Sequence, residues 1–198
     1  SNEIPVKGYS DQDGANPNAY LYNSGLNGTY DGVKYESVFR MENFANLTNH
    51  TYVKNESRSK MEFGLNCDIN NYGKFYNYGL IEFAGAIYAN GKANRYLDRT
   101  GTFYNYGTLQ KMGPGQIDGD IVNLGNGKLT SDEPSRTLIN GDLDNHQGTL
   151  AFKIGSNDSS SDDHDQLVVN GDLKLGGDLE LEIIDFDQLS LGSNYRII

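Results

Sequence analysis

The sequence has almost no cysteine: Cys67 is the single one among 198 residues. One cysteine excludes an intramolecular disulfide framework. With no second cysteine and no histidine cluster nearby, the sequence also gives no reason to expect a structural zinc site. We therefore expect Cys67 to act as a small, buried apolar residue.

Long hydrophobic runs and basic charge are also scarce. The longest mostly apolar run, residues 80–89, contains Glu82 and is about half as long as a transmembrane helix requires. We therefore expect no direct membrane insertion. Lys and Arg number 16 against 27 Asp and Glu, which gives a net charge of -11. This acidic balance excludes nucleic-acid binding, because phosphate contacts need a basic surface.

Helical patterns are nearly missing, whereas the chain contains 24 glycines and 14 tyrosines. Hydrophobic residues make up only 36% of the sequence, which indicates a thin core with much surface per residue. The many aromatic residues argue against disorder. This composition favours a repeat protein built from short strands and turns.

The clearest repeat relates residues 73–81 to residues 101–109, which share six identities in nine positions at an offset of 28. Weaker copies of the pattern Gly-x-apolar-x-Asn occur at residues 119–125 and 141–148, and partial copies precede them. A variant at residues 171–177 has Leu175 at the Asn position. Taking the Asn position as the register gives residues 23, 46, 77, 105, 123, 145 and 175. The mean spacing is (175 - 23)/6, or about 25 residues, which fits one coil of a parallel β-helix.

The sequence thus predicts an all-β, single-domain, right-handed parallel β-helix of about seven coils. We expect residues 1–18 to form an N-terminal extension or cap and residues 19–198 to form the β-helix, as part of a longer secreted protein. The apolar strand Tyr195–Ile198 would leave an open end, so either the chain continues or this strand caps the core.

Strand alternation assigns the two faces of the repeat. Phe75, Ile81, Phe103 and Leu109 have the same parity as the asparagines, so this face is predicted to point inward. The inward asparagines should form a hydrogen-bonded ladder through stacked coils. The predicted ladder consists of Asn46, Asn77, Asn105, Asn123 and Asn145. We expect the glycine that follows each Asn to adopt a positive φ at a sharp bend.

The opposite parity places Tyr76, Tyr78, Tyr104 and Tyr106 on the outer wall. We expect Ala45 and Leu47 on the coil before them and Val122 and Leu124 on the coil after them. Such a patch is either a binding site for a saccharide or protein, or a set of stacked rings that stiffens the sheet.

The recurring Asn-x-Gly-x-Leu/Ile modules resemble the haemagglutination-type repeats and autotransporter passenger β-helices of bacterial secreted adhesins. Residues 164–180 and the ending Asn194–Ile198 resemble the pattern near the ends of such solenoids. The resemblance covers about residues 70–198, and the first 70 residues depart from it, which leaves a distinct cap or an insertion open there. It implies a protein that is secreted or on the bacterial cell surface, with a carbohydrate or protein as its surface partner.

Acidic residues supply the remaining candidate sites. Asp120, Asp142 and Asp172 occupy equivalent repeat positions, where neighbouring charges would be relieved by splayed exposed side chains, by a bound cation or by raised pKa values. The run 157–165 reads as a solvated loop, in which Asp162, Asp163 and Asp165 are the calcium candidates. We expect no cofactor apart from this calcium option. The three histidines, His50, His146 and His164, match no metal or triad signature.

We therefore expect a non-catalytic, adhesin-like or structural β-helix segment that presents an outer binding face, with no catalytic residue. The alternatives are a polysaccharide lyase or glycoside hydrolase on the same scaffold, which would need converging carboxylates in a cleft, and a phage or capsular fibre segment.

Overall fold

The computed structural model describes residues 20–23, 28–30, 33–35, 37–41, 46–49, 52–65, 67–89, 101–113, 115–155, 164–185 and 195–198. These segments are all-β, with 22 strands, most of them three to five residues long. In them, no helix is long and apolar enough to cross a bilayer.

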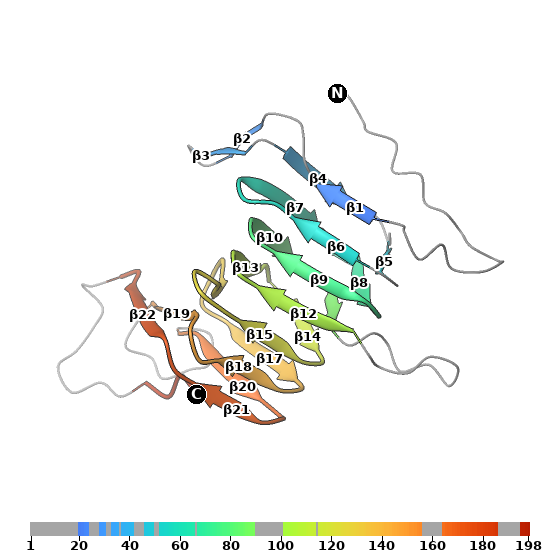
Figure 1. Cartoon of the computed structure of the whole chain (residues 1–198). Helices are drawn as coiled ribbons and strands as arrows, with labels where there is room; N and C mark the ends of the chain where they lie inside the picture. The colour runs from blue at the N-terminus through green and yellow to red at the C-terminus, as the bar shows by residue number, and fades with distance from the viewer. Residues whose placement is uncertain are drawn as a thin grey trace.

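Twenty of the strands stack into three parallel sheets (Figure 1). Sheet 1 contains β1 (Tyr20–Asn23), β6 (Tyr52–Asn55), β9 (Lys74–Asn77), β12 (Thr102–Asn105), β15 (Ile121–Asn123), β18 (Leu143–Asn145) and β21 (Leu173–Leu175). Sheet 2 contains β4 (Ser37–Met41), β7 (Ser59–Phe63), β10 (Leu80–Phe83), β13 (Thr108–Lys111), β16 (Lys128–Ser131), β19 (Thr149–Ile154) and β22 (Asp178–Ile183). Sheet 3 contains β5 (Asn46–Asn49), β8 (Asp68–Asn71), β11 (Ala86–Tyr88), β14 (Gln116–Asp118), β17 (Arg136–Asn140) and β20 (Gln166–Val169).

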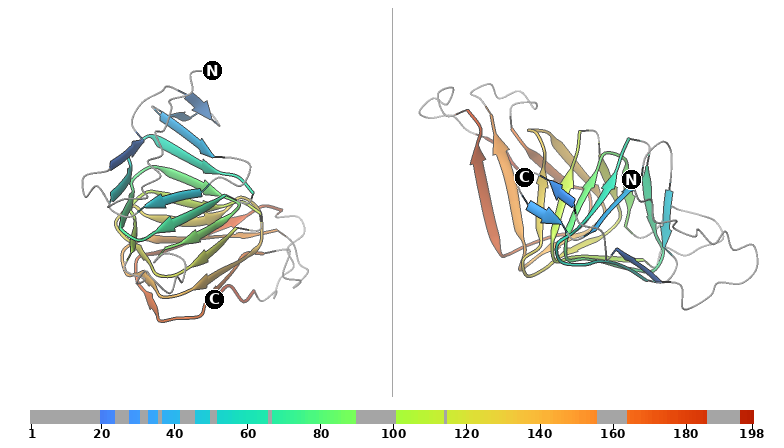
Figure 2. Two further views of the ribbon diagram at one scale, coloured as in Figure 1. Left: turned by 90° about the vertical axis from the view of Figure 1, so that its right-hand side faces the viewer. Right: turned by 90° about the horizontal axis from the view of Figure 1, so that it is seen from above.

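The chain visits the sheets in the fixed order 1, 2, 3 and then begins the next coil. This path confirms the predicted parallel β-helix of about seven coils, whose stacked strands are seen from two further directions in Figure 2. The first coil also carries an antiparallel hairpin, β2 (Gly28–Tyr30) and β3 (Val33–Tyr35), between its strands in sheets 1 and 2. Such a hairpin is an insertion into the coil, one of the two options that the sequence left open for the first 70 residues.

The core consists of apolar columns that run along the stack, to which all three sheets contribute. The four residues predicted to point inward are all buried, and the rings of Phe75 and Phe103 stack with centroids 4.6 Å apart. Sheet 3 contributes a nearly uniform aliphatic column of Leu47, Ile69, Ile87, Ile117, Ile139 and Val169. Cys67 is 1% exposed within this core, as predicted. Parallel in-register strands thus bury the same kind of side chain in coil after coil.

The glycines after the asparagines are required for a different reason from the one predicted. Gly79 and Gly107 do not have a positive φ. A Cβ atom on Gly79 would lie 2.1 Å from the carbonyl oxygen of Ser59, and a Cβ on Gly107 would lie 2.1 Å from that of Gly79. Close approach of backbones on neighbouring coils therefore excludes a side chain at this corner. Gly125, in the next copy, does have a φ of 58°.

Candidate functional site

An asparagine ladder lies at the corner between sheets 1 and 2. The side chains of Asn77, Asn105, Asn123 and Asn145 are buried, and each Nδ2 donates to the Oδ1 of the next asparagine at 2.6–2.8 Å. A second N–H of each amide bonds to a backbone carbonyl, such as that of Thr108, 3.0 Å from Asn77. Leu175 replaces the asparagine in the last coil, where Asn145 donates to the carbonyl of Gly176 instead.

The prediction for Asn46 is wrong. Asn46 lies in sheet 3, where its partner is Asp68, and Asn55 occupies the rung before Asn77. Asn55 donates to the Oδ1 of Asn77 at 2.8 Å. The pair Val53-x-Asn55 has the same apolar-x-Asn spacing as Phe75-x-Asn77, but no glycine follows it. At that corner the chain instead bends through Arg58, which has a φ of 63°.

A second, shorter ladder lies at the corner between sheets 3 and 1 and was not predicted. The Nδ2 of Asn49 donates to the Oδ1 of Asn71 at 2.7 Å, and Asn71 donates to the carbonyl of Ala89 at 2.9 Å. The coil of Asn55 and Asn71 therefore has buried amides at two of its three corners.

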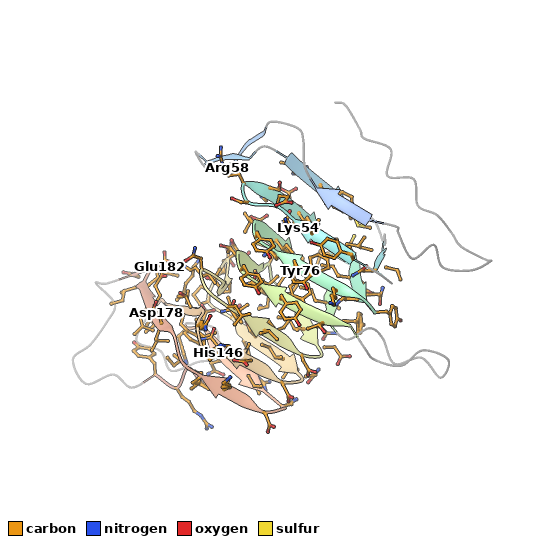
Figure 3. All side chains as sticks on the ribbon, in the orientation of Figure 1. Lys54, Arg58, Tyr76, His146, Asp178 and Glu182 are labelled. Carbon is orange, nitrogen blue, oxygen red and sulfur yellow. The ribbon has the colours of Figure 1, made fainter. Side chains whose placement is uncertain are left out.

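The outer face of sheet 1 carries the four predicted tyrosines, which we call the tyrosine wall. Tyr76 and Tyr104 stack with centroids 5.0 Å apart and planes at 12°, and Tyr78 and Tyr106 stack at 4.9 Å and 8°. The wall therefore consists of two parallel columns of rings, one ring per coil (Figure 3). Such contacts stabilise a sheet beyond the burial of area.

The outer faces of the columns are also covered. Before the wall, the ammonium group of Lys54 lies 5.2 Å from the ring centre of Tyr78, and the ring of Tyr52 lies 5.4 Å from that of Tyr76. After the wall, Val122 is the register partner of Tyr104. The predicted neighbour Leu47 is wrong, because Leu47 lies in the core column of sheet 3. The other predicted neighbour before the wall, Ala45, lies outside the described residues.

Ring stacking along the column determines how the wall meets solvent. The stacked faces of all four rings are covered, and so are the other faces of Tyr76 and Tyr78. For these two tyrosines, the parts open to a partner are the ring edges and the hydroxyl groups. Burial raises the pKa of Tyr106, and the neighbouring tyrosines add to this effect. Its phenol therefore remains protonated, and able to donate a hydrogen bond, well above neutral pH.

Charged pairs lie at both ends of the wall along the stack, directly beside it at Lys54 and one coil beyond it, past Val122, at Asp144. Lys54 pairs with Glu56 at 2.7 Å, and this hydrogen bond raises the pKa of Lys54. At the other end, Asp144 Oδ1 lies 2.5 Å from Nδ1 of His146, and Asp144 Oδ2 lies 3.1 Å from Nζ of Lys174. Some burial opposes ionisation of Asp144, but the hydrogen bonds from His146 and Lys174 outweigh it and lower the pKa of Asp144. The wall thus has an apolar centre and a charged rim, an arrangement typical of protein contact surfaces.

The three equivalent aspartates lie in one exposed column. An Oδ1 of Asp120 accepts the backbone N–H of Asp142 at 2.8 Å, and an Oδ1 of Asp142 accepts that of Asp172 at 2.7 Å. Of the three arrangements considered above, the structure has exposed side chains, each turned to the backbone of the next coil. This is a turn role for the carboxylates.

Asp165 was wrongly assigned to a solvated acidic loop. It is buried, and its carboxylate accepts hydrogen bonds from the hydroxyl of Ser131 and from the backbone N–H groups of Ser135 and Lys153, at 2.7–2.8 Å. His164 beside it is also buried. The other calcium candidates, Asp162 and Asp163, lie outside the described residues, as do residues 1–18 and His50. The described residues include no group of three or more His, Cys, Asp or Glu side chains that could hold a metal ion.

An ion-pair cluster on the outer face of sheet 2 was not predicted. The ammonium group of Lys60, fully buried, lies 2.8 Å from an oxygen of Glu62 and 2.9 Å from an oxygen of Glu82, and Arg40 also pairs with Glu62. The four charges balance. In the sequence, these residues appear only as charges at alternate strand positions. That pattern ordinarily indicates a strand face exposed to solvent, so it does not reveal the ion-pair cluster.

The cluster borders an open hollow of about 310 Å³. Two carboxylates from neighbouring coils beside a hollow are what a polysaccharide enzyme would require. Partial burial of Glu62 opposes ionisation of its carboxyl group. The hydrogen bonds from Arg40 and Lys60 outweigh this effect, however, and lower the pKa of Glu62. Burial likewise lowers the pKa of Lys60, but its two glutamates raise it by more. Glu62 is therefore a poor general acid and Lys60 a poor general base.

The interior of the β-helix offers no room for an organic ligand where its polar groups gather. Lys111, Ser131 and Asp165 line one end of a narrow space between sheets 2 and 3, whose free volume is about 30 Å³. That volume holds about one water molecule.

No protein-family model, no curated protein and no solved structure matches the chain significantly.

Proposed function

We propose that the chain is a non-catalytic β-helix module of a secreted or cell-surface bacterial protein, and that the tyrosine wall is its contact face. The observation that carries the proposal is the pair of stacked ring columns, Tyr76–Tyr104 and Tyr78–Tyr106, inside a charged rim. A stack needs no such rim for stability, whereas a contact surface benefits from one.

The partner meets ring edges and hydroxyl groups rather than open ring faces. A sugar that lay flat on Tyr76 or Tyr78 would have to displace Tyr52 or Lys54 from that ring. Hydrogen bonds from the phenols to glycan hydroxyls or to protein carbonyls require no such displacement. The wall is therefore suited to shallow, hydrogen-bonded contact with a surface glycan or protein.

The test compares wild-type protein with two double variants on a glycan array and on bacterial and host cell surfaces. Tyr78→Phe with Tyr106→Phe keeps the stack and removes the hydroxyl groups, and Tyr78→Ser with Tyr106→Ser removes both. We expect the first to weaken binding about tenfold, as for the loss of one or two hydrogen bonds, and the second to abolish it. Asn140→Ser, an exposed change on sheet 3, is the control and should bind normally.

The enzyme alternative predicts a different result. If Glu62 and Glu82 were catalytic, the protein would release reducing ends or unsaturated sugars from an acidic polysaccharide, and Glu62→Gln would stop the release. Such turnover would overturn the proposal. So would wild-type binding that survives in both tyrosine variants, because the contact face would then lie elsewhere.

A further inference from the structure

The last strand of sheet 2, β22, presents core-type residues to solvent. Leu179, Leu181 and Ile183 are 56%, 51% and 45% exposed. Their partners in the preceding coil, Leu150, Phe152 and Ile154, are 3%, 5% and 7% exposed. The apolar face of β22 is therefore built like the others but is not covered by another described coil (Figure 2). The neighbouring edge of β20 is occupied by residues 195–198, where the backbone N–H of Leu167 donates to the carbonyl of Ile197 at 2.8 Å.

The backbone of β22 is open on the same side. It pairs with β19 along one edge, and within the described segments no strand pairs with its other edge. An open edge above an apolar face is a template for another parallel strand.

The opposite end of sheet 2 is β4, and its side chains continue the same columns. Through successive register pairs, Phe39 belongs to the column that ends at Leu179, and Met41 to the column of Phe63 and Phe83. If the end of one molecule met the beginning of another in this register, Leu179 would lie on Phe39 and Leu181 on Met41. Both contacts join apolar side chains of the same face.

The charges at the two ends of sheet 2 favour head-to-tail stacking over contact between two ends of the same kind. Between Leu179 and Leu181, Glu180 faces the outside of the sheet and pairs with Lys128 at 2.7 Å. The equivalent residue on β4 is Arg40, which pairs with Glu62 and whose side chain is 58% exposed. Head-to-tail stacking therefore places a carboxylate beside a guanidinium. Two ends of the same kind, joined through antiparallel β22 strands, would instead oppose Asp178, Glu180 and Glu182 of both copies, and like charges directly opposite are destabilising.

We propose that a second copy of this chain stacks head to tail on the first, with β22 of one copy pairing in parallel with β4 of the next. The hairpin β2–β3 lies beside one end of β4 (Figure 1). Because the contact joins two different surfaces along the solenoid axis, it repeats without closing and gives a linear assembly.

Sedimentation velocity over a concentration series, with electron microscopy of the largest species, tests the proposal. The wild-type sedimentation coefficient should rise with concentration, and the assemblies should be one β-helix wide. Leu181→Asp should remain a monomer at every concentration, with an unchanged circular dichroism spectrum as the check on folding. Glu133→Arg, an exposed acid-to-base change away from both ends, should assemble like wild type.

Two charge reversals identify which ends meet. Arg40→Glu alone and Glu180→Arg alone each oppose like charges, and each should weaken association about fivefold, as for an exposed ion pair. Their equimolar mixture restores opposite charges at every junction and should assemble like wild type.

Three results would overturn the proposal: a wild-type protein that stays monomeric throughout, a Leu181→Asp variant that still assembles, or a mixture of the two reversals that remains as weak as each alone. Normal assembly of Arg40→Glu by itself would also overturn it, because β22 would then pair with β22 or with a different partner. None of these results depends on ligand binding by the tyrosine wall.

Discussion

Nδ2 of Asn77 donates to Oδ1 of Asn105, 2.8 Å away on the next coil, and the same bond recurs on either side from Asn55 to Asn145. Each inner amide is buried, and both its donor and its acceptor are used. A shift of one coil by a single residue would break two rungs and turn the core side chains outward. The ladder therefore fixes the register between coils as well as stabilising the corner.

Removal of one inner rung should cost considerable stability. In Asn105→Ala, the amide of Asn77 loses its acceptor and Asn123 loses its donor, both in the buried interior. Buried groups left without partners cost about 1–3 kcal/mol each, so we expect a loss of about 3 kcal/mol in the free energy of unfolding, measured with urea. Asn126→Ala, in an exposed turn, is the matched control. Equal losses in the two variants would mean that the ladder does not stabilise the fold.

The stacked rings should stabilise the protein as pairs. A double-mutant cycle of Tyr78→Ala and Tyr106→Ala should give a coupling free energy of about 1 kcal/mol, because the rings lie 4.9 Å apart and nearly parallel. The cycle is measured by urea unfolding of the four proteins. A second cycle of Tyr78→Ala with Tyr88→Ala, which lies on sheet 3, should show coupling near zero. If the first cycle shows no coupling, stacking of the tyrosine rings does not stabilise the fold, and contact with a partner is left as their role.

Local repetition in the sequence was sufficient to predict the fold. The near-identical copies around Asn77 and Asn105 gave both the coil length and the parity, and parity separates Phe75 in the core from Tyr76 on the wall. Predictions of which side chains point inward succeed in regular strands, because the strand backbone itself points successive side chains to opposite faces.

The errors concern residues whose position depends on irregular corners. Asn46 and Asn55 both follow an apolar residue by two positions, and neither has a glycine two positions later, so the repeat pattern does not distinguish them. The corner after Asn55 bends through Arg58 at positive φ, which the pattern does not reveal. The burial of Asp165 depends on donors 12, 30 and 34 residues away, which no local pattern reveals. The Lys60 cluster likewise forms only because Glu62 and Glu82 are register partners.

Acid should weaken the protein through Glu62. Its pKa in the folded state is lower than the ordinary value of 4.5, because the hydrogen bonds from Arg40 and Lys60 outweigh the effect of burial. A lowered pKa contributes stability above pH 4.5 that is lost as the pH falls through the folded-state value. The difference in unfolding free energy between wild type and Glu62→Gln should therefore be largest at neutral pH and shrink below pH 4.5. A difference that stays constant between pH 7 and pH 3 would contradict this assignment.

Lys111 should show a dependence of the same sign as Glu62, but at alkaline pH. Its ammonium group is buried beside the carbonyl of Gly113, and burial lowers its pKa from the ordinary 10.5 even though Asp132 and Asp165 favour the charged form. The unfolded chain therefore binds this proton more tightly than the folded chain, so the contribution of Lys111 to stability rises as the pH increases towards 10.5.

Lys111→Met removes the buried charge and keeps most of the volume. We expect it to raise the unfolding free energy by about 1 kcal/mol at pH 7, and this advantage should decline as the pH approaches the ordinary lysine value. Lys153→Met, which removes a half-buried ammonium group bonded to the carbonyl of Asp132, is the control and should show no such gain. If Lys111→Met destabilises the protein at pH 7, the bond from Nζ to the Gly113 carbonyl outweighs the cost of burying the charge.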